Sequence, residues 1–381
     1  MKNNITGKVP RYFEPYVNDC FHNCYAAVLQ YMGLNPDIIL ADYLSFMYDQ
    51  ANDNIGVNYL YRLNTSVEFS EEELNTSLEF VYLPATVNFS SDLRDLNGIK
   101  CKNKVNINMY VEDDPNVAYS RLKELIDNGK PVITAVDLYY MRYHRAYMKE
   151  HGIHCVVITG YDEENNCFEL FDKFRLSSSD FDGTLPMDEV NQGRVSDNPL
   201  PWGEMNKRPI RNLWMEICVD EAFSIDDDKL INVLKESYTR MAGKRNILGY
   251  KCGLDMLEAF EKDLMLKKED KLDLTNIDWT RVYWYRAYLN ISFKNIARNR
   301  KRFMVFVKEI DRLLPEDMVT EVCNCLEESS KHWEISANIA LKMGIKKSLD
   351  LTDELVKHLS EIRRQESRVV ERFEGYLSNL V

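Results

Sequence analysis

No apolar run in this 381-residue sequence approaches the roughly 20 residues that a membrane-spanning helix needs. The sequence is also short of positive charge, with 48 Lys and Arg residues against 61 Asp and Glu residues and a formal net charge of -13. A negative protein repels the phosphate backbone of a nucleic acid. The sequence therefore predicts a protein with neither a membrane nor a nucleic acid as partner.

Residues 1–8 lack the apolar stretch of a secretory signal, so we expect the protein to be cytoplasmic. In that compartment the nine cysteines are expected to be reduced thiols rather than a disulfide framework. Hydrophobic residues make up 45% of the chain, which at this length is enough for two cores. Two domains are therefore expected.

Cys20 stands at the start of a predicted buried helix. Residues 25–32 are nearly all apolar, and Gly33 followed by Pro36 is a typical helix end. A thiol at a helix start lies near unpaired backbone N–H groups and the positive end of the helix dipole, and both favour the thiolate over the thiol. The position suits a cysteine nucleophile, although a cysteine at a helix start can equally be a packing residue.

A β-hairpin is predicted where two β-rich runs, residues 151–162 and 167–174, flank a polar turn. With the turn centred near Glu163, His154 lies opposite Asp172. Opposed residues of an antiparallel pair have Cβ atoms roughly 5 Å apart, which allows an imidazole–carboxylate hydrogen bond. Such a pair fits either a catalytic dyad or a contact that only stabilises the sheet.

The sequence pattern changes from mixed to helical near residue 222. Residues 131–138 and 213–219 are β-branched or apolar runs typical of buried strands. From Lys229 onward, apolar residues recur three and four positions apart. We therefore predict an α+β domain with an antiparallel sheet over residues 1–222 and an α-helical domain over residues 223–381.

Cys20, His154 and Asp172 occur in this order along the chain and supply the three groups that cysteine acyl chemistry requires. A thiolate attacks, an imidazole takes and returns a proton, and a carboxylate holds the imidazole tautomer. His151 could compete with His154 as the base.

A metal site is the rival interpretation of the same region. Its ligands would be Cys20, His22, Cys24, His151, His154 and Cys155. These residues lack the paired spacing of structural zinc sites, so we expect no metal.

The Asp19–Cys20 start, Gly33, and the run 154–162 followed by Asp172 resemble papain-superfamily domains of the bacteriocin-processing type. Within that group the sequence is most similar to the butirosin biosynthesis protein H-like family, with which it shares a Cys-x-His start and a helical C-terminal half. The resemblance implies a papain-like cysteine protease fold for the first domain. It also implies a nucleophilic Cys20.

By the same resemblance, His154 would be the acid and base and Asp172 the orienting carboxylate of an acyltransferase. The acyl group would arrive on the 4'-phosphopantetheine of an acyl or peptidyl carrier protein, and no other cofactor would be needed. It would pass through a Cys acyl-enzyme to a small amine or a second carrier-bound acceptor, forming an amide in antibiotic biosynthesis of the nonribosomal peptide or aminoglycoside-like type. The alternatives are a cysteine peptidase or thioesterase, and a non-catalytic scaffold that binds a carrier protein.

The oxyanion-stabilising group departs from the family pattern. Peptidases of the bacteriocin-processing type have a Gln six residues before the cysteine, where this sequence has Glu14. An ionised carboxylate cannot donate a hydrogen bond. Asn18, or backbone N–H groups at the start of the Cys20 helix, would have to serve instead.

A locally basic stretch over residues 281–302 stands out in this acidic chain. Carrier proteins are acidic, so Arg298, Arg300 and Arg302 are candidates for a docking patch. The same pattern fits an ordinary helix whose charges face solvent and whose aromatic side chains lie in the core.

Overall fold

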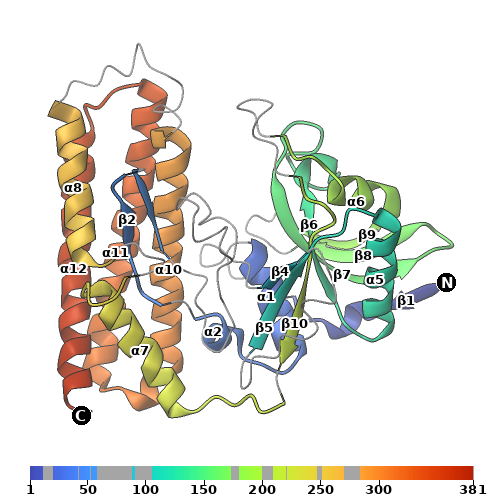
Figure 1. The fold of residues 1–381 in the computed structure, drawn as a ribbon, viewed down its shortest axis with the longest axis horizontal. Helices are drawn as coiled ribbons and strands as arrows, with labels where there is room; N and C mark the ends of the chain where they lie inside the picture. The colour runs from blue at the N-terminus through green and yellow to red at the C-terminus, as the bar shows by residue number, and fades with distance from the viewer. Residues whose placement is uncertain are drawn as a thin grey trace. The chain divides into compact units, whose positions relative to one another are not determined.

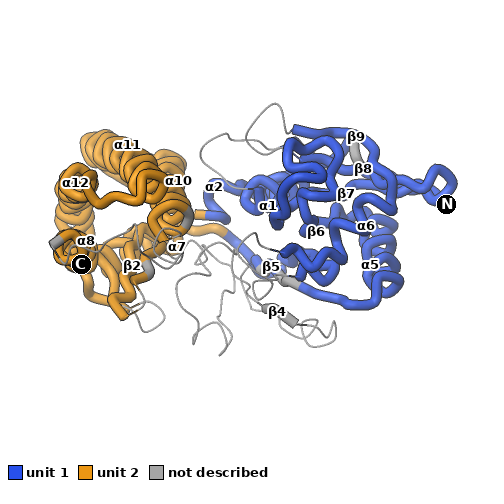
Figure 2. Tube along the Cα trace, turned by 90° about the horizontal axis from the view of Figure 1, so that it is seen from above, with its two compact units in different colours: residues 1–40, 64–70, 86–224 blue, residues 41–63, 71–85, 225–381 orange. Residues whose placement is uncertain are grey.

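The computed structural model contains two compact units, which Figure 2 shows in different colours. The first contains the described parts of residues 1–40 and 86–224, and the second those of residues 41–63 and 225–381. The structure describes residues 1–11, 20–41, 43–51, 53–57, 88–90, 105–172, 180–199, 209–219, 221–246, 251–269 and 284–380.

The first unit is built on one β-sheet (Figure 1). Its described strands are β1 (Lys2–Asn4), β4 (Asn88–Ser90), β5 (Val105–Tyr110), β6 (Val132–Asp137), β7 (Ile153–Asp162), β8 (Cys167–Asp172), β9 (Phe181–Pro186) and β10 (Trp214–Val219). Their order is β4-β5-β10-β6-β7-β8-β9, and β1 pairs with β7. The pair β4–β5 is parallel, and the other described pairs are antiparallel. The predicted α+β class with an antiparallel sheet is confirmed.

The helices of the first unit lie between these strands in the sequence. They are η1 (Thr6–Lys8), α1 (Cys20–Tyr31), α2 (Pro36–Ile39), α5 (Pro115–Asp127), η3 (Leu138–Tyr140) and α6 (Met187–Arg194). α1 packs against β7 and β10, and α6 packs against β6 and η3.

The sequence of α1 explains its place in the core. Every residue from Phe21 to Leu29 is buried, as expected for a helix with few polar side chains on any side. The helix ends in a Schellman motif, in which the N–H of Leu34 donates to the Leu29 carbonyl at 2.9 Å and the N–H of Gly33 donates to the Gln30 carbonyl at 3.0 Å. Gly33 has a φ of 80°, a left-handed value that glycine adopts without a Cβ clash.

The second unit is mainly helical, as predicted for the C-terminal part of the chain. Its described elements are β2 (Met47–Asp49), β3 (Asn54–Gly56), α7 (Asp227–Met241), α8 (Leu254–Glu269), η4 (Trp284–Leu289, a π-helical stretch), α10 (Asn290–Glu309), η5 (Asp311–Leu313), α11 (Glu316–Lys346) and α12 (Thr352–Ser378). α11 packs between α10 and α12, and α8 packs against α12 (Figure 1).

The second unit also includes residues that precede the expected boundary at 222/223. The β2–β3 hairpin and the residues before it belong to the helical unit. Phe46 is fully buried there, with its ring 5.8 Å from that of Trp333 and 6.4 Å from that of Phe260. An aromatic side chain gains most by burial among other rings, and this contact places the segment with the helices.

A buried ion pair joins α10 to α12. Arg300 and Glu366 have side chains with 0% exposure, and Arg300 donates two hydrogen bonds to the Glu366 carboxylate, at 2.7 and 2.8 Å. Arg300 also donates to the Ser45 carbonyl at 2.7 Å. Ser329 and Trp333 donate to Glu366 at 2.6 and 3.1 Å. Such a network is costly to break because either charge, left alone, stays buried without its partner.

His332 of α11 and His358 of α12 lie with their Nδ1 atoms 2.7 Å apart. Burial, together with the charge of His332, lowers the pKa of His358; Glu354 opposes this shift and Lys357 adds to it. Because the folded pKa is depressed, the unfolded chain binds more protons below the usual histidine pKa of about 6.5. Stability should therefore fall as pH falls through this range.

We expect the second unit to be less stable at about pH 5.5 than at about pH 8 through the depressed pKa of His358, by a modest amount because the ring is partly solvated. Urea denaturation of the wild type and of His358→Gln at both pH values measures the effect. The variant should show a smaller pH dependence. An equal pH dependence in the two proteins would contradict the assignment.

None of the helices in the described part of the chain has an apolar stretch long enough to cross a membrane. No disulfide bond joins any two of the eight cysteines among the described residues.

Candidate active site

Cys20 is the first residue of α1, and its side chain is partly exposed. The residues that follow it in the helix are buried and pack in the core. The first residue of the helix therefore lies at the boundary between the core and solvent. Glu14 and Asn18 lie outside the described residues, so the predicted oxyanion group stays a prediction.

His154 and Asp172 come from the neighbouring strands β7 and β8. Both are buried, with exposures of 4% and 2%. His154 Nε2 lies 2.8 Å from Asp172 Oδ2, a hydrogen-bond distance. Because a carboxylate only accepts, Nε2 is the protonated nitrogen of this pair, and Nδ1 is the nitrogen left for another partner.

Cys20 is the other residue that acts on His154. Burial alone would lower the pKa of His154, but the charges of Asp172 and Cys20 and hydrogen bonds to both residues raise it well above its ordinary value. His154 is thus hydrogen-bonded to Asp172 and also influenced by the thiol of Cys20. An imidazole in this arrangement holds a proton readily, as an acid that protonates a leaving group must.

A β-bulge in β7 puts His154 and Asp172 on the same face of the sheet. Near the turn, Asp162 pairs with Cys167, and this register continued would set Asp172 opposite Val157, on the face away from His154. Between Ile158 and Gly160 the register shifts by one residue. An inserted residue moves the side chains beyond it to the other face.

The bulge also corrects one detail of the prediction. Beyond it, Val157 pairs with Phe171, so Asp172 continues the ladder opposite Val156, and His154 is its diagonal neighbour. The prediction that His154 lies directly opposite Asp172 was wrong by two residues. The two side chains still meet, because diagonal neighbours share a face and long side chains reach across the gap.

Tyr143 is a site residue that the sequence did not reveal. Its hydroxyl donates to Asp172 Oδ2 at 2.8 Å. The tyrosine comes from the segment between η3 and β7, which the sequence marks only as rich in aromatic and basic side chains. No local pattern specifies which ring of such a segment reaches a strand 29 residues away.

His144 and His151 lie near the site but have other surroundings. The ring of His144 is 6.0 Å from that of His154, and burial and the charge of His154 lower the pKa of His144. His151 Nδ1 lies 2.7 Å from Asp137 Oδ2. In the β6–β7 ladder, Val136 pairs with His154 and Asp137 with Ile153, so Asp137 lies on the opposite face from His154. His151 therefore forms a separate dyad.

The residues of the alternative metal site are not drawn together by the part of the chain that the structure describes. Among those residues, no group of three or more His, Cys, Asp or Glu side chains is arranged to hold a metal ion.

The expected docking patch is corrected by the burial of two of its three arginines. Arg300 has 0% exposure and Arg302 7%. Arg300 forms an ion pair with Glu366 inside the helical unit. Only Arg298 of the three is partly exposed, so this set does not present a row of charges to a partner.

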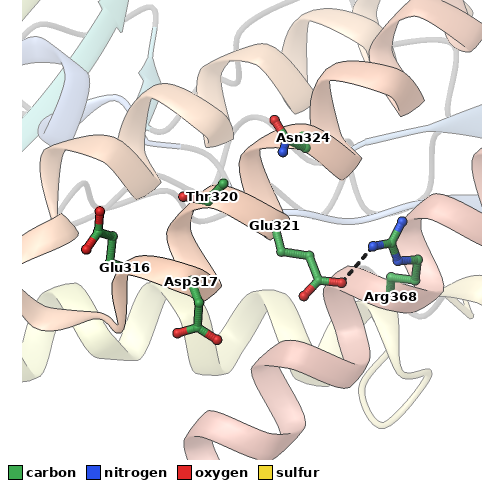
Figure 3. Close-up of a pocket in the computed structure, with 6 residues that line it drawn as sticks. All are labelled: Glu316, Asp317, Thr320, Glu321, Asn324 and Arg368. Atoms are coloured by element: carbon green, nitrogen blue, oxygen red, sulfur yellow. Dashed lines mark hydrogen bonds and ion pairs between the residues drawn. The ribbon is translucent and has the colours of Figure 1, made fainter.

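An open hollow lies on the helical unit, between the first turns of α11 and the later part of α12 (Figure 3). Three of its six lining residues are acidic, and one of them, Glu321, accepts a hydrogen bond from Arg368 at 2.8 Å. It contains neither a thiol nor an imidazole.

The first unit is thus an α+β domain in which a strand histidine is hydrogen-bonded to a strand aspartate and a helix-start cysteine influences the pKa of that histidine. Residues 20–173 match the family model described as Butirosin biosynthesis protein H, N-terminal. The predicted resemblance to the butirosin biosynthesis protein H-like family is confirmed over this segment, which includes Cys20, His154 and Asp172. A search of the curated proteins found no match.

Proposed function

We propose that the first unit is a papain-like cysteine acyltransferase that forms an amide from a carrier-protein thioester and an amine, in antibiotic biosynthesis. The observation that carries the proposal is the hydrogen bond between the buried side chains of His154 and Asp172, with Cys20 close enough to contribute to the raised pKa of His154. The name of the matched family, a butirosin biosynthesis protein, supports the biosynthetic setting. The proposed partners are an acyl or peptidyl carrier protein and a small or carrier-bound amine.

In the first half-reaction, the Cys20 thiolate attacks the thioester carbonyl. The carbon–sulfur bond to phosphopantetheine breaks, and the imidazolium of His154 gives its proton to the departing thiolate. In the second half-reaction the amine attacks the Cys20 acyl-enzyme and gives a proton to His154, and the Cys20 thiolate leaves. The balance is thioester plus amine to amide plus thiol. Asp172 stabilises the imidazolium in both halves.

The electrostatic part of the proposal concerns the oxyanion of each tetrahedral intermediate. Backbone N–H groups at the start of α1 point away from the helix and are the available donors near the thiol. Asn18 is the proposed side-chain donor. Each step above uses residues of the chain and the phosphopantetheine arm, so the proposal needs no metal.

Mass spectrometry of the intact protein after exposure to acyl-carrier thioesters tests the proposal. We expect a covalent acyl adduct, mapped by peptide digestion to Cys20, that persists in buffer and is discharged by an amine with formation of the amide. A chelator should leave the adduct and its discharge unchanged.

The other outcomes discriminate between the alternatives. Rapid loss of the adduct in buffer, with no amide formed from any amine, would favour a peptidase or thioesterase. Binding of the carrier protein without an adduct would favour a non-catalytic scaffold. An adduct that maps to another cysteine would contradict the assigned nucleophile.

A further inference from the structure

Tyr143 and His154 share one oxygen atom of Asp172. The Tyr143 hydroxyl and His154 Nε2 each lie 2.8 Å from Asp172 Oδ2. Both groups donate, because the carboxylate has no proton to give. The oxygen that faces the imidazole therefore divides its negative charge between two donors.

The Tyr143 ring is held in place by the sheet. It stacks on Phe181, with ring centroids 4.5 Å apart and ring planes 18° from parallel. Phe181 is the first residue of β9 and pairs in register with Asp172. The ring of His144 stands edge-on to Tyr143 at 6.4 Å. The strand that carries the carboxylate thus also positions, through its neighbour β9, the hydroxyl that binds that carboxylate.

The hydroxyl keeps its proton. Burial, with the charge of Asp172 and a hydrogen bond to it, raises the pKa of Tyr143 well above its ordinary value. The titratable groups that act on Tyr143 and His154 are Cys20 and Cys24 of α1 and Asp172 of β8. His144, which lies beside both rings, is influenced in turn by Arg145 and Glu150. Tyr143 therefore remains a hydrogen-bond donor when the neighbouring groups change their charge.

We propose that Tyr143 is a positioning residue, whose hydroxyl fixes Asp172 Oδ2 on His154 and withdraws charge from that oxygen. The inference rests on the proposed role of His154 as the acid and base of Cys20. A carboxylate oxygen with two donors attracts the imidazolium proton less than one with a single donor. Tyr143 thereby sets how readily His154 releases its proton to the departing thiolate.

The pH profile of Cys20 alkylation by iodoacetamide tests this inference without an acyl substrate. The rate of Cys20 alkylation is followed by peptide mass spectrometry. Its pH profile should contain a limb at higher pH, which is a change in rate that occurs as His154 loses its proton. In Tyr143→Phe this limb should move to higher pH by about half a unit, because a full hydrogen bond to a charged group is worth more than one unit and only part of it reaches His154.

Two further variants separate this role from a structural one. Tyr140→Phe removes the hydroxyl of a nearby tyrosine, at the end of η3, whose ring contacts His151 instead. The limb of this variant should coincide with that of the wild type. In an Asp172→Asn background, Tyr143→Phe should cause no further shift, since Tyr143 acts through Asp172. An unmoved limb in Tyr143→Phe, a downward shift, or a full shift in the Asp172→Asn background would each overturn the inference.

The same data distinguish a failure of the proposed function from a failure of the inference about Tyr143. If Cys20 is no partner of His154, the wild-type profile will follow an ordinary thiol titration and His154→Ala will leave it unchanged. If the partnership holds but Tyr143 plays no part, the wild-type profile will depend on His154 while Tyr143→Phe superimposes on it.

Discussion

Cys20→Ala is expected to abolish acyl transfer, by at least about 10⁴-fold, while the protein keeps its fold. The substitution removes one partly exposed sulfur atom at the first residue of α1. Alanine is a good helix former, so the helix itself should be undisturbed. Rates from a small thioester mimic, with circular dichroism and thermal unfolding of the same samples, measure both halves of the expectation.

Cys24→Ala is the matched control. Cys24 lies one helical turn later, and its exposure is 5%. Its loss removes core contacts, so we expect a modest fall in stability and near-normal transfer. The opposite pattern, with Cys24→Ala inactive and Cys20→Ala active, would place the nucleophile one turn further along α1.

Substitutions of His154 and Asp172 should reduce the rate of acyl transfer to different extents. His154→Ala removes the group that carries the proton, and Asp172→Asn removes only the charge that orients and stabilises it. We expect the loss in Asp172→Asn to be on the order of 10²-fold smaller than in His154→Ala. Wild-type rates in both variants would remove the triad from the mechanism.

Arg300→Ala is expected to destabilise the helical unit by about 3–5 kcal/mol, because it leaves the Glu366 carboxylate buried without its cation. Both side chains of the pair have 0% exposure. Urea denaturation monitored by helical circular dichroism gives the free energy of unfolding.

The neighbouring residue supplies the control. Lys301 on the same helix pairs with Glu334 at 2.6 Å, but its side chain is 23% exposed and that of Glu334 is 47% exposed. Lys301→Ala should cost less than about 1 kcal/mol. The double variant Arg300→Met with Glu366→Leu should recover part of the Arg300→Ala loss, since it leaves no lone buried charge. Equal costs for Arg300→Ala and Lys301→Ala would contradict the account.

The sequence alone determined the local features of the candidate site. The apolar run after Cys20 and the stop at Gly33 specify a buried helix, because burial and a left-handed glycine are properties of the segment itself. The two β-rich runs on either side of a polar turn specify the β7–β8 hairpin. The helical periodicity after Lys229 likewise predicted the second unit.

Only the tertiary structure decided what depends on register and on burial. The bulge between Ile158 and Gly160 sets which residue Asp172 faces, and a shift of one residue exchanges the faces of the sheet. Tyr143 reaches Asp172 because β9 holds its ring. Arg300 lies in the core because Glu366, 66 residues later, neutralises it there. A local pattern carries no information on partners so distant in the chain, since packing and not propensity brings them together.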